Sequence, residues 1–166
     1  MEWETLEPMS RAFVKDQDAP DELPERPVSP NPNFVTLRGL RLIDEKLEAL
    51  RRDLAHAQHD SDRGAIALAS RDLRYWTQRR TSAQVVEPPK RVTAVAFATA
   101  VTIRRGDGRQ QRFAIVGEDE ADPAQGSIAY SSPLARALLG KIPGDFAEIA
   151  GGEVEIVALE AIGPEG

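Results

Sequence analysis

The sequence contains no cysteine, few aromatic residues and no long apolar run. Without cysteine, the 166-residue chain can have no disulfide, no thiolate zinc site and no cysteine nucleophile. No apolar run reaches the length of a membrane-spanning helix. The first eight residues hold three glutamates instead of the basic and apolar pattern of a signal peptide. We therefore expect a cytoplasmic protein that does not contact a membrane.

The net charge of −6 is unevenly distributed along the chain. Residues 1–35 carry eight acidic and three basic side chains, and residues 85–166 carry twelve acidic and eight basic ones. Residues 36–84 carry ten basic and seven acidic side chains. Neutralising the phosphates of duplex DNA needs a clear excess of lysine and arginine, so this composition argues against a protein that wraps DNA.

Residues 1–33 contain six prolines and eight acidic residues. A segment with so few apolar side chains cannot bury enough surface to offset the entropy lost on ordering. We expect a disordered or loosely docked acidic tail, with a short docking motif around Phe13 and Val14 as the alternative.

Residues 34–86 have the spacing of an antiparallel coiled-coil hairpin. Thr36 is in position to cap the first helix, and the break at residues 56–64 predicts a tight turn with Ser61 or Asp62 capping the second. Apolar residues recur at steps of three and four, which is typical of a heptad seam. The seam positions are Leu40, Ile43, Leu47, Leu50, Leu54 and Ala57, then Ile66, Ala69, Leu73, Trp76, Arg80 and Ala83. Arg80 is the exception, and its stem is expected to lie on apolar surface near the base.

Residues 91–162 show the pattern of a small antiparallel sheet with one helix. Residues 105–108 (Arg-Gly-Asp-Gly) predict a hairpin turn, and residues 133–139 predict a short helix that begins at Ser131 or Ser132 and ends at Gly140. Strands are expected around Val95, Phe97, Val101 and Ile103, and over residues 111–116, 126–130, 146–149 and 154–159. The predicted fold class is therefore α+β, with a helical hairpin followed by the sheet.

Several ordered segments resemble the Gre (GreA/GreB) family of bacterial transcription elongation factors. They are FAIVGEDEADP at 113–123, GSIAYSSPLARALLGK at 126–141, PGD at 143–145 and GGEVEI at 151–156 in the C-terminal half, and VTLRG at 35–39 and SAQV at 82–85 at the hairpin base. The resemblance implies an FKBP-like topology for the sheet domain. It also implies binding to RNA polymerase at its secondary channel.

The resemblance further implies that two loops of the sheet domain face polymerase. One is the acidic loop with Glu118, Asp119, Glu120 and Asp122; the other contains Ser131, Ser132, Pro133, Ala135 and Arg136. The family usually has Asp-Ser-Pro in the second loop, so Ser131 replaces an acid. Taken alone, the acidic loop could also be a cation site or an acid–base pair, but it lacks an EF-hand pattern, and a solvated loop is the commoner case. The Ser-Pro pair could simply cap a helix.

At the hairpin tip this sequence departs from the family. The resemblance implies an Asp and a Glu three residues apart, which help to hold a second catalytic magnesium ion so that polymerase cleaves its backtracked RNA. Here Asp60 and Asp62 are two residues apart, His59 precedes them, and Arg63 stands where the second acid should be. The arms are also shorter than expected for the family by about two turns each, or about 12 Å at 1.5 Å per residue. Side-chain motion cannot make up that difference, because carboxylate–metal contacts are only about 2 Å long.

We therefore predict a protein that is not itself an enzyme and has no cofactor or metal. It would bind bacterial RNA polymerase without stimulating cleavage and contact nucleic acid only indirectly, through polymerase. A monomer is expected, with self-association through the hairpin as the alternative.

Three other functions stay open: a cleavage factor using Asp60 and Asp62, a general protein-interaction module, and a prolyl isomerase. The last needs an aromatic pocket, whereas Phe97, Phe113, Tyr130 and Phe146 are spaced like core residues. His56, His59, Asp60 and Asp62 could bind a metal, although polar clusters at a tip are usually turn chemistry.

Overall fold

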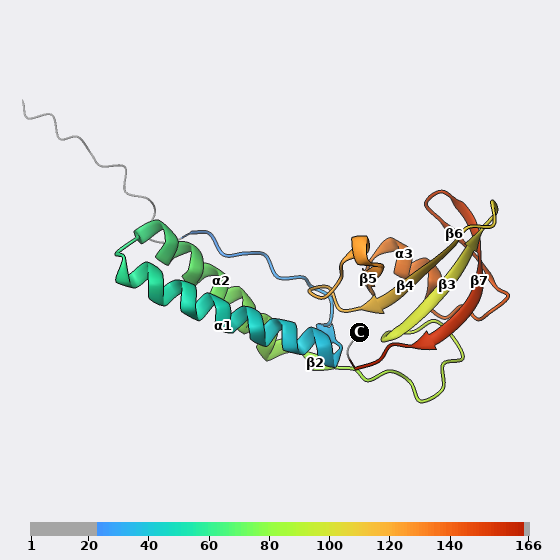
Figure 1. The fold of residues 1–166 in the computed structure, drawn as a ribbon, viewed down its shortest axis with the longest axis horizontal. Helices are drawn as coiled ribbons and strands as arrows, with labels where there is room; N and C mark the ends of the chain where they lie inside the picture. The colour runs from blue at the N-terminus through green and yellow to red at the C-terminus, as the bar shows by residue number, and fades with distance from the viewer. Residues whose placement is uncertain (1–22, 165–166) are drawn as a thin grey trace, which may run out of the picture.

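The computed structural model describes residues 23–164, which form a helical hairpin projecting from a sheet domain (Figure 1). No helix within these residues has the length and apolar character needed to cross a membrane. The expected docking motif around Phe13 and Val14 lies outside the described residues. In chain order the elements are β1 (Phe34–Val35), α1 (Leu37–His59), α2 (Arg63–Ser82), β2 (Gln84–Val85), β3 (Thr99–Arg105), β4 (Gln110–Val116), the 3-10 helix η1 (Pro123–Gln125), β5 (Ser127–Ala129), α3 (Pro133–Leu138), β6 (Phe146–Ile149) and β7 (Gly152–Ala161).

Each helix of the hairpin begins at a side-chain cap. Thr36 Oγ1 accepts a hydrogen bond from the Gly39 amide at 2.9 Å, and Asp62 Oδ1 accepts one from the Ala65 amide at 3.0 Å. These caps satisfy amides that have no partner inside the helix. The predicted turn over residues 56–64 is too long, because α1 continues to His59 and the chain reverses over three residues only. Ser61 has a φ of 56°, a left-handed conformation that allows this short reversal.

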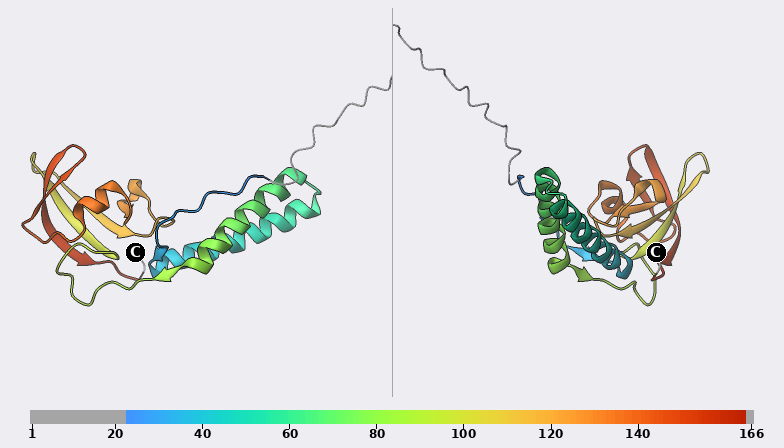
Figure 2. Two further views of the ribbon diagram at one scale, coloured as in Figure 1. Left: turned by 180° about the vertical axis from the view of Figure 1, so that it is seen from behind. Right: turned by 60° about the vertical axis from the view of Figure 1, so that its left-hand side comes forward.

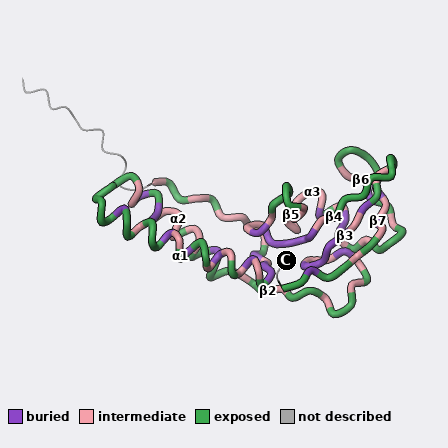
Figure 3. The backbone as a smooth tube through the Cα atoms, viewed as in Figure 1, coloured by how far each residue is buried: buried purple, intermediate pink, exposed green. Residues whose placement is uncertain are grey.

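The heptad seam packs α1 against α2 as predicted, with one exception. Ile43, Leu47 and Leu50 are buried, and Figure 3 shows short buried pieces along the hairpin between exposed and intermediate ones. Arg80 was predicted at a seam position with its stem on apolar surface, and this is wrong: Arg80 is exposed, whereas its neighbour Arg79 is 2% exposed. Ala83, the last predicted seam position, does pack against the cluster of Val35, Ile43 and Leu47.

A two-stranded parallel sheet closes the base of the hairpin. β1 pairs with β2, so that Phe34 lies opposite Gln84 and Val35 opposite Val85. The Val86 amide extends this ladder by donating to the Val35 carbonyl at 2.9 Å. The hairpin therefore begins and ends at one point, where the chain enters from residue 33 and leaves toward the sheet domain.

The sheet domain is a five-stranded sheet in the order β5-β4-β3-β7-β6, with α3 packed on it. Its pairings are antiparallel except that β5 runs parallel to β4. The predicted α+β class with one short helix is confirmed. Ile103, Ile115, Leu138 and Ile156 are fully buried in its core.

Two expectations for the sheet domain need correction. The first strand begins at Thr99, so Val95 and Phe97 precede it; Val95 is nevertheless in the core. Phe146 was expected in the core but is 54% exposed, because it lies on the edge strand β6. The predicted unit boundaries at 34–86 and 91–162 stay a prediction.

The described part of the predicted N-terminal tail, residues 23–33, is an extended segment. It runs beside the hairpin toward β1, as the left view of Figure 2 shows. Its side chains contact α2 and the sheet domain through hydrogen bonds and ion pairs. This stretch is therefore docked by specific contacts, more closely than composition alone suggested.

Candidate functional site at the hairpin base and tip

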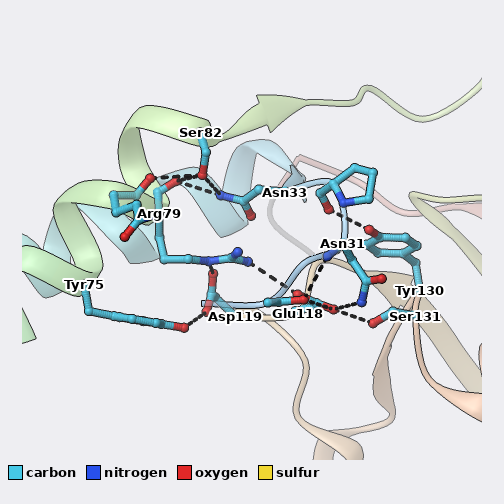
Figure 4. A network of polar contacts seen from close by, with 12 residues as sticks. Asn31, Asn33, Tyr75, Arg79, Ser82, Glu118, Asp119, Tyr130 and Ser131 are labelled. Atoms are coloured by element: carbon cyan, nitrogen blue, oxygen red, sulfur yellow. Dashed lines mark hydrogen bonds and ion pairs between the residues drawn. The ribbon is translucent and has the colours of Figure 1, made fainter. Parts of the chain in front are cut away.

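The acidic loop after β4 lies against the base of the hairpin (Figure 4). Gly117 is buried against β1: a Cβ on it would lie 2.4 Å from the carbonyl oxygen of Phe34. Only a residue without a side chain allows so close a backbone approach. The loop turns at once, because the Glu120 amide donates to the Gly117 carbonyl at 3.2 Å. It thereby presents the carboxylates of Glu118, Asp119 and Glu120 to the hairpin.

Glu120 binds the start of α1. Its Oε2 accepts a hydrogen bond from Thr36 Oγ1 at 2.6 Å, and its Oε1 lies 3.3 Å from Arg38 Nη1. The residue is 7% exposed. A carboxylate is favoured there, because the N-terminus of a helix carries partial positive charge. Gly39 leaves room for it, since a Cβ on Gly39 would lie 2.6 Å from Glu120 Oε2.

Asp119 binds α2 through Arg79. Arg79 Nε donates to Asp119 Oδ2 at 2.5 Å, and Tyr75 Oη donates to Asp119 Oδ1 at 3.3 Å. Burial, reinforced by the Asp119 charge, raises the pKa of Tyr75 above its ordinary value. The backbone of Arg79 is held as well, because Asn33 Nδ2 donates to its carbonyl at 2.7 Å. The buried guanidinium thus joins the second helix to the sheet domain.

Side chains from three separate segments bind the carboxylate of Glu118. Its Oε1 accepts from Ser131 Oγ at 2.7 Å, Asn31 Nδ2 at 2.8 Å and Ser29 Oγ at 3.1 Å. Arg79 Nη2 lies 3.7 Å from its Oε2. Burial acts to raise the pKa of Glu118, but the three hydrogen bonds and the Arg79 charge outweigh it, so the pKa is lowered. The ionised form is therefore the one that this site stabilises.

The expectation of a solvated acidic loop is wrong. The side chains of Glu118, Asp119 and Glu120 are 18%, 13% and 2% exposed, and each pairs with an arginine. Asp122 is different: it is exposed and caps η1, accepting from the Ala124 amide at 3.1 Å. Three of the four carboxylates predicted to face polymerase therefore face the hairpin in this structure.

Replacing Glu118 with Gln should reduce the unfolding free energy in a pH-dependent way. Because the pKa of Glu118 is lowered in the folded state, its ionised form stabilises the protein above the unfolded-state pKa. That contribution is lost as the pH falls through the folded-state value. We expect a deficit of about 1.5 kcal/mol at pH 7, the low end for hydrogen bonds to a charged group. Urea denaturation of both proteins from pH 7 to pH 3 checks this; a deficit that does not shrink at low pH would contradict it.

Aromatic side chains pack at the joint and do not line a pocket. Phe34 of β1 lies 6.0 Å from Phe97 and 5.4 Å from Tyr130, measured between ring centroids. Tyr130 Oη donates to the Pro32 carbonyl at 2.6 Å. These rings therefore fill the contact between β1 and the sheet domain, an arrangement that gives a prolyl isomerase no support.

The second candidate docking loop lies at the start of α3. Ser132 caps this helix by accepting from the Ala135 amide at 3.2 Å, so the helix-capping explanation holds. Pro133 and Arg136 are exposed, whereas Ala135 is fully buried and cannot be part of a surface. Ser131 is half-buried and donates to Glu118. The candidate surface here is thus formed by Pro133 and Arg136, beside the joint.

The hairpin tip holds His59, Asp60, Asp62 and Arg63, all of them exposed. Asp62 is used as the N-cap of α2 and Asp60 ends α1. Within residues 23–164, no three histidine, aspartate or glutamate side chains lie close enough together to hold a metal ion. The chemistry of the tip is therefore that of a capped turn.

Arg79 and Asn33 were not predicted as site residues from the sequence. Arg79 adjoins the predicted seam position, and its partners Glu118 and Asp119 are about forty residues away in the chain. Asn33 was assigned to a tail, yet it is 4% exposed. The one usable signal was a concentration of carboxylates opposite a basic hairpin, which predicts attraction without naming the pairs.

Comparison with known proteins agrees with this architecture. The model of the GreA/GreB transcription elongation factor C-terminal domain matches residues 89–161. GreB of Neisseria meningitidis serogroup A is 41% identical over 98 residues, which cover 55% of this chain and 60% of that protein. The chain thus spans less than two thirds of the GreB proteins it matches. GreA of Paracoccus denitrificans is 30% identical over 151 residues, which cover 77% of this chain and 97% of that protein.

Solved structures give a weaker likeness. The GreA factor homologue Gfh1 of Thermus thermophilus aligns with 79% of this chain and 100% of its own length, at 18% identity and a TM-score of 0.38. These values are too low to relate the angle between hairpin and sheet domain to that in Gfh1. The Paracoccus GreA match extends over both parts of the chain, and the C-terminal model covers the sheet domain. The chain therefore belongs to the GreA/GreB family of transcription elongation factors.

Proposed function

We propose that this protein binds bacterial RNA polymerase at the secondary channel and regulates transcription without stimulating transcript cleavage. The protein is then not an enzyme itself but an accessory factor. Family membership supports the binding. The observation that supports the absence of cleavage stimulation is made at the tip, where a carboxylate oxygen of Asp62 accepts a hydrogen bond from the Ala65 amide.

The tip lacks the chemistry that cleavage needs. Holding a second magnesium ion at the catalytic centre requires carboxylate oxygens that are free to coordinate it. Asp62 accepts a capping hydrogen bond, and withdrawing it would leave amides at the start of α2 without a partner. Arg63 follows directly and would place positive charge next to a cation. These features favour a hairpin that occupies space without supplying ligands.

The length of the hairpin supports the same proposal. The alignment with Paracoccus GreA spans 151 residues but only 77% of this 166-residue chain. The relative therefore has residues with no counterpart here, and from the sequence we expect the missing residues to belong to the hairpin arms. α1 has 23 residues and is about 34 Å long at 1.5 Å per residue. A shorter arm keeps the tip away from the metal that longer arms would reach.

Replacing Arg136 with Glu should weaken binding to core polymerase on the order of tenfold. Arg136 is exposed beside the candidate docking loop, so reversing its charge changes a surface contact while leaving the core intact. Arg109→Glu is the matched control, because Arg109 is equally a surface arginine, in the turn between β3 and β4. Binding is measured by titrating labelled full-length protein with purified core polymerase at moderate salt.

The controls separate the rival functions. If the parent protein does not bind core polymerase, the proposed function is wrong and a general interaction module is favoured. If Arg136→Glu and Arg109→Glu bind equally well, the docking loop is not the contact. Equal thermal unfolding temperatures for both variants show that a loss of binding is not a loss of fold.

A further inference from the structure

Residues 25–33 form a segment, here called the N-terminal strap, that touches both parts of the molecule (Figures 1 and 2). At its start it lies on α2. Arg26 places its guanidinium carbon 3.9 Å from the ring centroid of Tyr75 and lies 3.6 Å from Asp72. Glu25 pairs with Arg74 at 2.6 Å. These contacts hold the strap along the outside of the second helix.

The end of the strap lies on the sheet domain and the joint. Ser29 and Asn31 donate to Glu118, and the Pro32 carbonyl accepts from Tyr130. Asn33 then donates to the carbonyl of Arg79 on α2 (Figure 4). One short extended segment is therefore bound to α2, to the acidic loop and to Tyr130, which precedes the second docking loop.

The covalent connection between the hairpin and the sheet domain is a single linker. Residues 86–98 join β2 to β3 without helix or strand and include Pro88 and Pro89. A swing of the hairpin about this linker would move α2 away from the acidic loop. The strap crosses from one to the other, so a swing must break its contacts at one end. The contacts of the strap differ in strength, because the Glu25–Arg74 ion pair is exposed and therefore weak.

We propose that the N-terminal strap holds the hairpin at one angle to the sheet domain, through the hydrogen bonds of Ser29 and Asn31 to Glu118. The strap acts as a brace that adds to the direct contacts across the joint, namely the Arg79–Asp119 pair, the binding of Glu120 to the start of α1 and the packing of Phe34 on the sheet domain. With the brace in place, the tip points in one direction relative to the docking surface. When Ser29 and Asn31 lose their donors, the hairpin samples a range of angles about residues 86–98.

The absence of cysteine makes the test direct, because two introduced cysteines are the only sites that take a thiol-specific spin label. Gln58→Cys near the tip and Arg109→Cys in the sheet domain are both exposed positions on opposite parts of the molecule. Double electron–electron resonance on the full-length protein then gives the distribution of distances between the two spin labels. The measurement needs no polymerase, so its result is independent of the proposed function.

We expect one narrow distance distribution for the labelled parent. Replacing Ser29 and Asn31 together with Ala should at least double its width, and Asn31→Asp, which places a second carboxylate beside Glu118, should broaden it too. Glu25→Ala is the matched control on the same segment and should leave the width unchanged. Unchanged circular dichroism excludes unfolding as the cause. A broad distribution for the parent, or equal widths for parent and both strap variants, would overturn the proposal.

Discussion

Arg79→Met is expected to lower the unfolding free energy by about 3 kcal/mol, the low end for removing one partner of a buried ion pair. The Arg79 side chain is 2% exposed, and its guanidinium pairs with both Asp119 and Glu118. Methionine fills the space of the side-chain stem but leaves two largely buried carboxylates without their cation. The cost is therefore mainly that of unpaired buried charge and not of lost packing.

The neighbouring arginine provides the control for this prediction. Arg80 pairs with Asp44 at 2.6 Å, but those side chains are 45% and 49% exposed. Because exposed pairs contribute about 0–1 kcal/mol, Arg80→Met should cost less than 1 kcal/mol. Urea denaturation followed by circular dichroism measures both variants. Equal costs for the two would mean that Arg79 does not hold the joint.

Gly117→Ala should cost about 2–3 kcal/mol, at the upper end for overpacking a well-packed site. The new Cβ would meet the Phe34 carbonyl oxygen at 2.4 Å and the Val35 Cα at 3.5 Å. Both are backbone atoms of β1, which is itself held by β2, so neither can swing aside as a side chain would. The acidic loop must instead withdraw from the hairpin, and its ion pairs lengthen with it.

Gly106→Ala is the matched control, because a Cβ there meets nothing within 4 Å. This change should be neutral or slightly stabilising, since alanine restricts the unfolded chain more than glycine does. Thermal and urea unfolding of both variants give the comparison. A Gly117→Ala protein as stable as the Gly106→Ala protein would show that the loop does not lie tightly on β1.

The parts of the fold that were predictable are those that repeat along the chain. A heptad seam predicts the hairpin because every turn of both helices adds the same apolar step. Thr36 was identified as the cap of α1, and Asp62 was one of two candidates, with Ser61, for the cap of α2. The error between Arg79 and Arg80 arose near the base of the hairpin, where the acidic loop decides which of the two arginines is buried.

The joint could not be predicted from local pattern. Most of its bonds link residues far apart in the chain, such as Arg79 with Asp119, 40 positions away, and Ser29 with Glu118, 89 positions away. Composition predicted a disordered or loosely docked tail for the strap, because the segment has few apolar side chains. The contacts that hold it are polar, and such contacts leave no apolar pattern in the sequence. Ser131 illustrates the point. In sequence it is a departure from an acidic family position, whereas in the structure its hydroxyl donates to Glu118, where an aspartate would repel that carboxylate.

Transcript cleavage in stalled, backtracked polymerase complexes tests the central claim most directly. The full-length protein is added at concentrations that saturate its binding, and the length of the RNA 3′ end is followed on a gel beside a GreA with an acidic tip. We expect the RNA to keep its length during the time in which the GreA shortens it. Shortening by this protein, abolished by changing Asp60 and Asp62 to Asn, would contradict the account.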